Sequence, residues 1–388
     1  MKTYDYIFIG GGLSGLMTAY YMCHDVFFKE KSILILDKSP KNTNDKTWCY
    51  WHDSKDDWDF LAYKKWNQVL FRSDVFSKIF SIQPYQYKMI RSIDFYEFII
   101  RELQKNECVS FIYDEISEIS ENTKEVIVAG KQASYTGKQA FNSLLNIVAL
   151  EQASDLYPYL KQHFVGWFIQ TPKAVFNEDL VTFMDFSIPQ QNNTRFIYIL
   201  PFTENKALVE YTLFSNELLP FEEYEKGIED YLKSFGIDSY TILEKEQGNI
   251  PMTAYPFQQK NTKRLWHIGS AGGWTKASTG YTFYNTAKES KNLIENLKGY
   301  SVNQTPKRHT FYDAIFIEVL YHYNYLGRKI FTSLFKRNAI QSLFSFLNSE
   351  SDIYTELKII ASAPTLPFLK SFFKFYYKIL IVSFLNKK

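Results

Sequence analysis

Residues 5–16 read DYIFIGGGLSGL, and this stretch decides the fold. The aromatic and β-branched residues before the glycines predict a strand, and LMTAYYMCH at 16–24 predicts the helix that follows. A second apolar run, SILIL at 32–36, predicts the next strand. A strand, a tight turn, a helix and a strand form a βαβ unit, so we expect a parallel sheet to open the chain.

The glycines of this turn have the spacing GxGxxG. The first permits a tight turn, the second lets a pyrophosphate approach the backbone, and the third lets helix and strand pack closely. The free N–H groups at the start of the helix would face the phosphates, and an acidic residue that ends the second strand can bind a ribose. Glycines at a βα turn can also be merely structural, but this combination predicts bound FAD or NAD. The candidate residues are Gly10, Gly12, Leu13, Ser14, Gly15 and Asp37.

A second glycine-rich loop lies in residues 266–283, WHIGSAGGWTKASTGYTF, between a short strand and a helix expected from about Tyr284. Such a loop can return to the first site and place backbone N–H groups near an electron-rich ring edge, which favours FAD over NAD. The alternative is a flexible glycine turn. The candidate residues here are Gly269, Gly272, Gly273, Thr279 and Gly280.

The rest of the chain alternates between strand and helix patterns. Strands are predicted at Val109–Tyr113, Glu125–Val128 and Leu144–Leu150, a hairpin at Arg195–Leu200 and Lys206–Phe214, and helices at Ile93–Leu103 and Phe221–Phe235. The expected class is α/β: a Rossmann-type FAD-binding domain like those of glutathione reductase and the flavin hydroxylases, with an inserted β-sheet substrate domain. We assign 1–75, 90–150 and 245–300 to the FAD-binding domain, 151–244 to the substrate domain, and 301–388 to a helical segment that associates with membranes.

Composition excludes several classes of protein. Apolar residues make up 46% and charged residues 22%, which excludes a disordered chain, and a net charge of +2 is too small for a nucleic-acid-binding protein. Three cysteines without a CxxC pair, and histidines without ligand spacing, predict no disulfide framework and no metal site. We expect neither a signal peptide nor a transmembrane helix, and therefore a cytoplasmic protein at the inner face of the cell membrane.

The membrane expectation depends on residues 369–385, LKSFFKFYYKILIVSFL. Lys370, Lys374 and Lys378 recur every four residues and form one basic stripe on a helix otherwise covered by aromatic and aliphatic side chains. Such a helix can lie in the lipid interface with its lysines toward anionic headgroups. It can equally pack on the body of the protein.

Together, eight segments resemble the flavoprotein-type lycopene cyclases, specifically the bacterial β-cyclase branch. They follow the family's order from one end of the chain to the other. The segments are DYIFIGGGLSGL at 5–16, NDKTWCYW at 44–51, HFVGWFIQT at 163–171, MDFSIPQ at 184–190, ILPFTENKALVEYTLFS at 199–215, IPMT at 250–253, GSAGGWTKASTGYTF at 269–283 and LFSFLN at 343–348.

The resemblance implies noncovalent FAD that acts in its reduced state, NAD(P)H as the reductant, and cyclisation of a linear carotene such as lycopene without net redox change. The family's glutamate motif falls on LVEYT at 208–212, so its essential first glutamate is Glu210 and its second is replaced by Tyr211. Lys46 and Thr47 lie in the matching DKTWCYW segment, which we expect at the flavin or substrate wall, although a polar loop with buried tryptophans is an alternative. Arg91 is expected at an FAD phosphate or on the plain surface.

Glu210 suits the role of acid by its position in a strand. With a period of two it shares a face with Leu208, Thr212 and Phe214, so burial should raise its pKa enough to keep the carboxyl protonated. A protonated carboxyl can protonate a terminal double bond, and an anionic reduced flavin with aromatic faces can stabilise the cation. By itself the pattern also fits an exposed edge glutamate.

Two rival functions remain open at this point. A flavin-dependent monooxygenase or an isoprenoid reductase would share the fold, and a peripheral protein could bind carotenoid without chemistry. Many related flavin hydroxylases carry Gly-Asp where this chain has Gly269-Ser270, which favours the cyclase branch. Asp185 is a further candidate base, or a strand-end cap. The oligomeric state is open.

Overall fold

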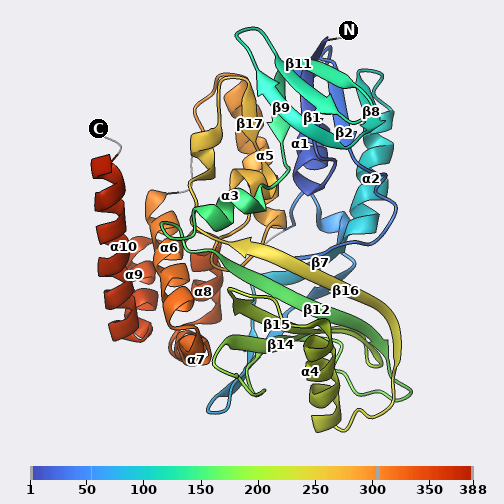
Figure 1. Cartoon of the computed structure of the whole chain (residues 1–388). Helices are drawn as coiled ribbons and strands as arrows, with labels where there is room; N and C mark the ends of the chain where they lie inside the picture. The colour runs from blue at the N-terminus through green and yellow to red at the C-terminus, as the bar shows by residue number, and fades with distance from the viewer. Residues whose placement is uncertain (1–2, 54, 303–305, 386–388) are drawn as a thin grey trace.

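The computed structural model describes residues 3–53, 55–302 and 306–385. Its strands form three sheets, and its last five helices, α6 to α10, gather along one side of the molecule (Figure 1). The first sheet lies at the end that carries the N-terminus, and the long strands β12 and β16 cross the middle of the molecule (Figure 1).

The first sheet has the order β8-β2-β1-β11-β10-β9, with β17 paired to β11. Strands β8, β2, β1, β11 and β17 are parallel, which confirms the predicted βαβ unit. Ile7 and Ile9 face one side of the sheet, and Phe8 packs on the other side against α1 and α5. The bounds are β1 Thr3–Ile9, α1 Leu13–Cys23, β2 Ile33–Asp37, α2 Ser92–Gln104, β8 Val109–Tyr113, β9 Ile116–Glu121, β10 Val126–Gly130, β11 Ser134–Asn142, β17 Leu265–His267 and α5 Phe283–Leu297.

One predicted strand of this region is wrong. Residues Leu144–Leu150 contain the start of helix α3 (Ile147–Gln152), because the Asn146 side chain accepts a hydrogen bond of 3.0 Å from the Ala149 N–H and caps a helix. The strand beside β1 is the preceding segment, β11, whose sequence SYTGKQAFN has polar residues and a glycine among its apolar ones.

The second sheet has the order β16-β12-β15-β14-β13-β5-β6. The hairpin of β14 and β15 is confirmed, and helix α4 packs on the face that carries Val209 and Tyr211. The assignment of 1–75 to the first domain is corrected for β5, because β5 pairs with β13 of this sheet. The bounds are β5 Gln68–Arg72, β6 Ser77–Ser81, β12 Leu160–Gln170, β13 Leu180–Asp185, β14 Thr194–Thr203, β15 Lys206–Ser215, α4 Phe221–Ser234 and β16 Thr241–Met252.

A small third sheet joins the two larger cores. Its strands are β3 (Thr47–His52), β7 (Gln86–Arg91) and β4 (Lys64–Trp66), in the order β3-β7-β4. Trp48 and Tyr50 belong to the core under the first sheet, and Trp51 belongs to the core under the second. Neighbouring residues of β3 thus pack into both cores, since side chains alternate along a strand.

The C-terminal helices are α6 (Lys307–His322), α7 (Gly327–Arg337), α8 (Ile340–Leu347), α9 (Ile353–Ser362) and α10 (Thr365–Leu385). Among the described residues, no helix combines the length and the apolar character needed to cross a bilayer. The expected segment 301–388 includes residues 303–305 and 386–388, which lie outside the described residues.

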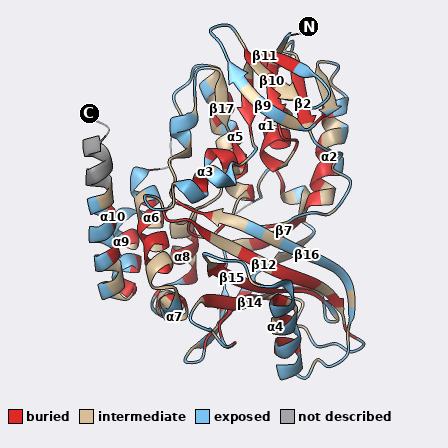
Figure 2. Ribbon diagram, in the orientation of Figure 1, coloured by how far each residue is buried: buried red, intermediate tan, exposed pale blue. Residues whose placement is uncertain are grey.

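The basic stripe of α10 is not directed as predicted. Lys374 Nζ lies 2.9 Å from His322 Nε2, and Lys378 Nζ lies 3.2 Å from the buried Glu318 carboxylate, so two of the three lysines contact α6. Figure 2 shows exposed segments along α10, and the exposed residues of this helix include the aromatic Phe372, Phe373, Tyr376 and Tyr377. The reason is that α6 offers a carboxylate and an imidazole that pair with the lysines.

Candidate active site

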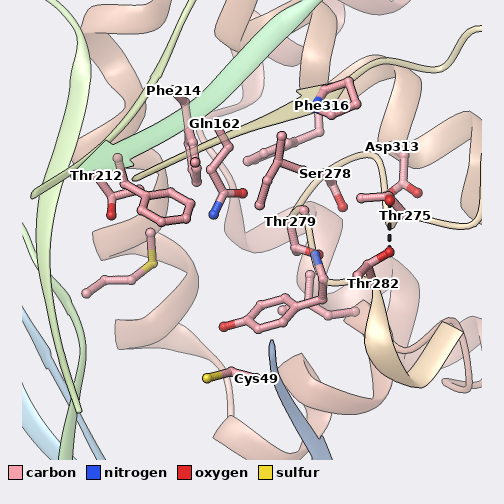
Figure 3. Close-up of a pocket in the computed structure, with 18 of the residues that line it drawn as sticks. Cys49, Gln162, Thr212, Phe214, Thr275, Ser278, Thr279, Thr282, Asp313 and Phe316 are labelled. Atoms are coloured by element: carbon pink, nitrogen blue, oxygen red, sulfur yellow. Dashed lines mark hydrogen bonds between the residues drawn. The ribbon is translucent and has the colours of Figure 1, made fainter. Parts of the chain in front are cut away.

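A cavity of about 840 Å³ extends from the first glycine turn to the C-terminal helices. Its walls come from the second and third sheets, both glycine-rich loops, and helices α6 to α10. Figure 3 shows one part of it, where Gln162, Thr212 and Phe214 of the second sheet lie opposite Ser278 and Thr279 of the second glycine-rich loop. Most of the lining is apolar, with few polar groups, as is typical of a pocket for a large organic ligand.

The first turn has the form that a pyrophosphate requires. Gly10 has φ +97°, and a Cβ there would lie 2.1 Å from Ser143 Oγ, while a Cβ at Gly15 would lie 2.3 Å from the Gly10 carbonyl oxygen. Gly12 has open space where a side chain would be, and no side chain caps helix α1. Gly12, Leu13 and Ser14 line the cavity, so the free N–H groups of α1 are available to a phosphate.

The second glycine-rich loop meets the first turn, as the sequence predicted. A Cβ at Gly269, which has φ +58°, would lie 2.3 Å from Ser14 Oγ. Gly269, Thr279 and Gly280 line the cavity. Gly272 and Gly273 do not line it and instead shape the loop. Side-chain hydroxyls order the loop, because Thr275 Oγ1 lies 3.1 Å from Ser270 Oγ and 2.9 Å from Thr282 Oγ1 (Figure 3).

The predicted cofactor residues Asp37 and Arg91 stand outside the cavity lining, as do Gly10, Gly15, Gly272 and Gly273. Asp37 Oδ2 accepts a 2.7 Å hydrogen bond from the Gly11 N–H and lies 3.1 Å from Lys41 Nζ. Arg91 forms a two-point ion pair with Asp94 at the start of α2, with distances of 2.6 and 2.7 Å. This pairing raises the pKa of Arg91 and holds its guanidinium away from the cavity.

Lys46 and Thr47 line the cavity at the start of β3. Thr47 was predicted at the flavin or substrate wall, and its hydroxyl donates a 2.7 Å hydrogen bond to the Glu246 carboxylate. Of the two tryptophans in this segment, Trp48 lines the cavity, and Trp51 stacks on Phe344 of α8 at 4.4 Å.

Glu210 lies on β15 in the cavity wall, 7% exposed. Thr212 and Phe214, on the same face of the strand, also line the cavity. No hydrogen bond reaches the Glu210 carboxyl from the part of the chain that the structure describes. Burial raises its pKa well above the ordinary value, and the neighbouring Glu246 raises it further. Burial and the neighbouring carboxyl thus both favour the neutral, protonated form of Glu210.

The sequence analysis missed a second carboxylate. Glu246 lies on β16 and lines the cavity beside Glu210. Burial raises its pKa above the ordinary value, while the hydrogen bond from Thr47 and the charge of Lys46 act in the opposite direction. The strand pattern of β16 is weak, since TILEKEQGNIPM contains five charged or amide side chains, a glycine and a proline among its twelve residues, so the position could not be recognised.

A cluster of hydroxyls and one thiol lies next to Glu210. Tyr87 OH lies 2.7 Å from Tyr198 OH and 2.8 Å from Tyr281 OH, which links the third sheet, the second sheet and the second glycine-rich loop. Cys49 also lines this part of the cavity, and burial raises the pKa of its thiol to about 12. The cluster places aromatic faces and neutral polar groups near the acid.

Asp185, the further candidate base, lies outside the cavity lining. Its carboxylate is fully buried and pairs with Arg72 at 3.2 Å and with Tyr231 OH at 2.9 Å, and it accepts a hydrogen bond from the Ser187 N–H. Of the two roles considered for Asp185, catalytic base and strand-end cap, these contacts favour the strand-end cap.

The two-loop glycine site at a largely parallel sheet, beside a second, mostly antiparallel sheet, defines the Rossmann-type α/β flavoprotein fold. Solved structures agree with this fold. A geranylgeranyl bacteriochlorophyll reductase-like protein from Thermoplasma acidophilum superimposes with a TM-score of 0.59 at 13% identity over 95% of this chain and 98% of its own. A flavoprotein/dehydrogenase from Cytophaga hutchinsonii gives a TM-score of 0.60 at 11% identity over 93% of this chain and 96% of its own.

Within that class the chain belongs to the lycopene cyclase protein family, whose sequence profile matches residues 5–372. A curated relative is the lycopene beta-cyclase of Pantoea ananas. It is 26% identical over 294 residues, which cover 72% of this chain and 71% of the relative. The predicted family and fold class are thus confirmed.

Proposed function

We propose that the protein is a lycopene β-cyclase that closes the linear ends of lycopene into β-ionone rings, giving β-carotene through γ-carotene without net redox change. The observation that carries the proposal is the position of Glu210, a buried carboxyl without a hydrogen-bond donor among the described residues, in an apolar cavity next to a dinucleotide-type glycine turn. Family membership and the β-cyclase relative support the choice of substrate.

The proposed cofactor is FAD, reduced by NAD(P)H. The residues that would hold it are the Gly12–Ser14 turn and the loop around Gly269, which contact each other at the same end of the cavity. The fit is supported by the uncapped start of α1 and by the open space at Gly12. When bound in its reduced form, the flavin supplies negative charge that stabilises a carbocation.

The chain's own groups account for the acid chemistry. Glu210 donates its proton to the terminal double bond of the polyene end, and a neighbouring double bond then attacks the cation to close the ring. A general acid of this kind contributes about 10²–10⁴-fold to the rate. The aromatic faces of Tyr198 and Tyr281 lie in the same wall and favour the cation by about 0.5–2 kcal/mol each. The apolar walls exclude water that would otherwise capture it.

The two sheets divide the work in this proposal. The first sheet, with the glycine loops, holds the cofactor, and the second sheet carries the acid and the substrate wall. The C-terminal helices form the apolar end of the cavity, where Phe316, Phe331 and Phe368 contribute to the lining. A long hydrocarbon would lie along these aromatic side chains.

We also propose that α9 and α10 rest on a lipid surface and admit the substrate there. Leu369 and Phe372 line the cavity and are also exposed on the outside of the molecule. Other apolar side chains of these two helices are also exposed: Ile353, Tyr354, Leu357, Leu366, Phe373, Tyr376 and Tyr377. Contact through aromatic side chains, rather than through the lysine stripe, agrees with the packing of Lys374 and Lys378 on α6.

The function is tested by expression in a lycopene-accumulating bacterial host, with chromatography and mass measurement of the pigments. The expected product is a cyclic isomer of unchanged mass. A monooxygenase or a reductase would change the mass and consume NAD(P)H in proportion to product, and a carotenoid-binding protein would leave lycopene unchanged. Glu210→Gln should lose turnover by at least about 100-fold while keeping FAD, and Glu217→Gln, on the exposed connection after β15, should not.

The lipid contact is tested by flotation with liposomes. Phe373→Ser and Tyr377→Ser should each weaken binding, because both side chains are 65% exposed on α10. Val26→Ser is the control, because Val26 is an apolar residue remote from α10 and is 85% exposed. Equal flotation of all variants would contradict this part of the proposal.

A further inference from the structure

Three neighbouring strands bring two carboxyl groups over one glycine. Gly166 of β12 is paired with Glu210 of β15 on one side and with Glu246 of β16 on the other. A Cβ at Gly166 would lie 2.8 Å from Glu210 Cγ and 3.2 Å from Glu246 Cγ. Because Gly166 has no side chain, the side chains of Glu210 and Glu246 can both lie over it in the cavity wall.

The surroundings of the two carboxyls differ. Glu246 accepts a hydrogen bond from the Thr47 hydroxyl, and the Lys46 ammonium is among the charges that act on it. Glu210 is more deeply buried and receives no hydrogen bond from the described residues. A hydrogen-bond donor and a cation favour the ionised form, and an apolar environment favours the neutral form. Glu246 is therefore the carboxylate of the pair, and Glu210 the carboxylic acid.

A further polar group on the same face points to a ligand here. Gln162 lies four residues before Gly166 on β12, and its side chain projects into the cavity (Figure 3). Its Oε1 atom is buried and has no partner within the described part of the chain. A buried amide oxygen without a partner is costly, and the hydrocarbon substrate has no donor to offer, so this atom points to a bound cofactor or water in this part of the cavity.

We propose that Glu246 is the base that completes the proposed cyclisation: it accepts the proton released by the ring cation and returns it to Glu210. This inference rests on the proposed function. Glu210 gives its proton to a carbon of the terminal double bond and becomes a carboxylate. After ring closure, a C–H bond next to the cationic carbon breaks, its electron pair forms the new double bond, and its proton goes to Glu246. Transfer of that proton from Glu246 to Glu210 restores both groups, so the product is an isomer.

The charged and titratable groups around the pair set its pH dependence. Glu246 is influenced by Glu210, by Glu244 two residues earlier on β16, and by Lys46. The Cys49 thiol also faces both carboxyls, and the pKa of this thiol is raised to about 12, so it stays neutral. Tyr198 and Tyr281 face Glu210, and burial keeps both phenols neutral by raising their pKa values. Of the two paired carboxyls, Glu246 is thus the one that ionises first as the pH rises.

The test uses the purified full-length FAD-loaded protein with lycopene in liposomes, and compares Glu246→Gln, Glu246→Asp, Thr47→Val, Glu210→Gln and Glu217→Gln. Flavin absorbance gives the loaded fraction. We expect Glu246→Gln to lower turnover by roughly 100-fold and Glu246→Asp to recover part of it. Glu217, on the exposed connection after β15, is the control, and its variant should stay within about twofold of wild type.

Two readouts separate a base from a structural residue. If Glu246 must be ionised, turnover falls at low pH, and Thr47→Val moves this fall to higher pH because the lost hydrogen bond lowered the pKa of Glu246. A cation without its base should also be captured by water or lose a different proton, so Glu246→Gln should yield hydroxylated or altered-ring products. Full turnover with unchanged products in Glu246→Gln, or an unmoved low-pH fall in Thr47→Val, would overturn the inference. Failure of the proposed function is distinct, because the wild-type protein would then form no cyclic isomer.

Discussion

A methyl group at Gly166 would lie 2.8 Å from Glu210 Cγ, closer than side chains approach one another in folded proteins. The glycine is thus required by the glutamate beside it. We predict that Gly166→Ala lowers the free energy of unfolding by about 1–3 kcal/mol and reduces turnover, because it separates the two carboxyls. Gly137→Ala is the matched control, since a Cβ there would lie 2.8 Å from Ile7 in the first sheet. It should cost similar stability but keep turnover per folded molecule, and denaturant unfolding with a cyclisation assay measures both.

Glu210 should make the folded protein less stable as the pH rises. Its pKa is higher in the folded chain than in the unfolded chain, so between these two values the folded state binds more protons. Stability then falls as the pH rises through this interval, by about 1.4 kcal/mol for each unit of pKa difference. We predict that Glu210→Gln is more stable than wild type at pH 7–8 and that the difference shrinks toward pH 4.5. Urea unfolding across this range measures it, and parallel curves would contradict the prediction.

The contact of α10 with α6 depends on a buried carboxylate. Glu318 is fully buried and pairs with Lys378 at 3.2 Å and His322 at 3.0 Å. Lys378→Met should weaken the docking of α10 by about 1–3 kcal/mol, less than for a fully buried pair because Lys378 reaches the surface. Lys370→Met, at the exposed end of the same stripe, should have little effect. Hydrogen exchange of residues 365–378 followed by mass spectrometry separates the two variants.

The thiol of Cys49 should react slowly. Burial raises its pKa to about 12, so almost none of it is thiolate at pH 8. We predict that a maleimide labels Cys49 in the folded protein far more slowly than in the unfolded chain, and that the rate increases only as the pH approaches 12. Peptide mapping after timed labelling provides the measurement. Rapid labelling at pH 8 would show that the thiol is exposed to solvent.

The local patterns of the sequence predicted the parts of the fold that local chemistry determines. The Gly10–Gly15 turn, the β14–β15 hairpin and helix α2 are specified by spacing and periodicity within one segment. The contact of Ser14 with Gly269 was also predictable, because two glycine-rich loops that each follow a strand can meet at one site.

Other features could not be predicted because they depend on partners distant in sequence. Glu246 becomes part of the site only through pairing of β16 with β12, and its strand has no clear alternation of apolar residues. Arg91 is an exception, because its partner Asp94 lies only three residues away, and this local ion pair competes with any phosphate. Lys378 turns toward Glu318, 60 residues earlier, which helical periodicity on α10 alone cannot reveal.

The single acid at position 210 has a consequence for a substrate with two equivalent termini. In the described part of the chain, one buried glutamate pair lies in one cavity. The two ends of a rod-like molecule cannot lie beside Glu210 at the same time, so a product with two rings requires two successive binding events. Between them the half-finished molecule must withdraw and reverse its direction, and the share that escapes at this stage would set the ratio of one-ringed to two-ringed pigment.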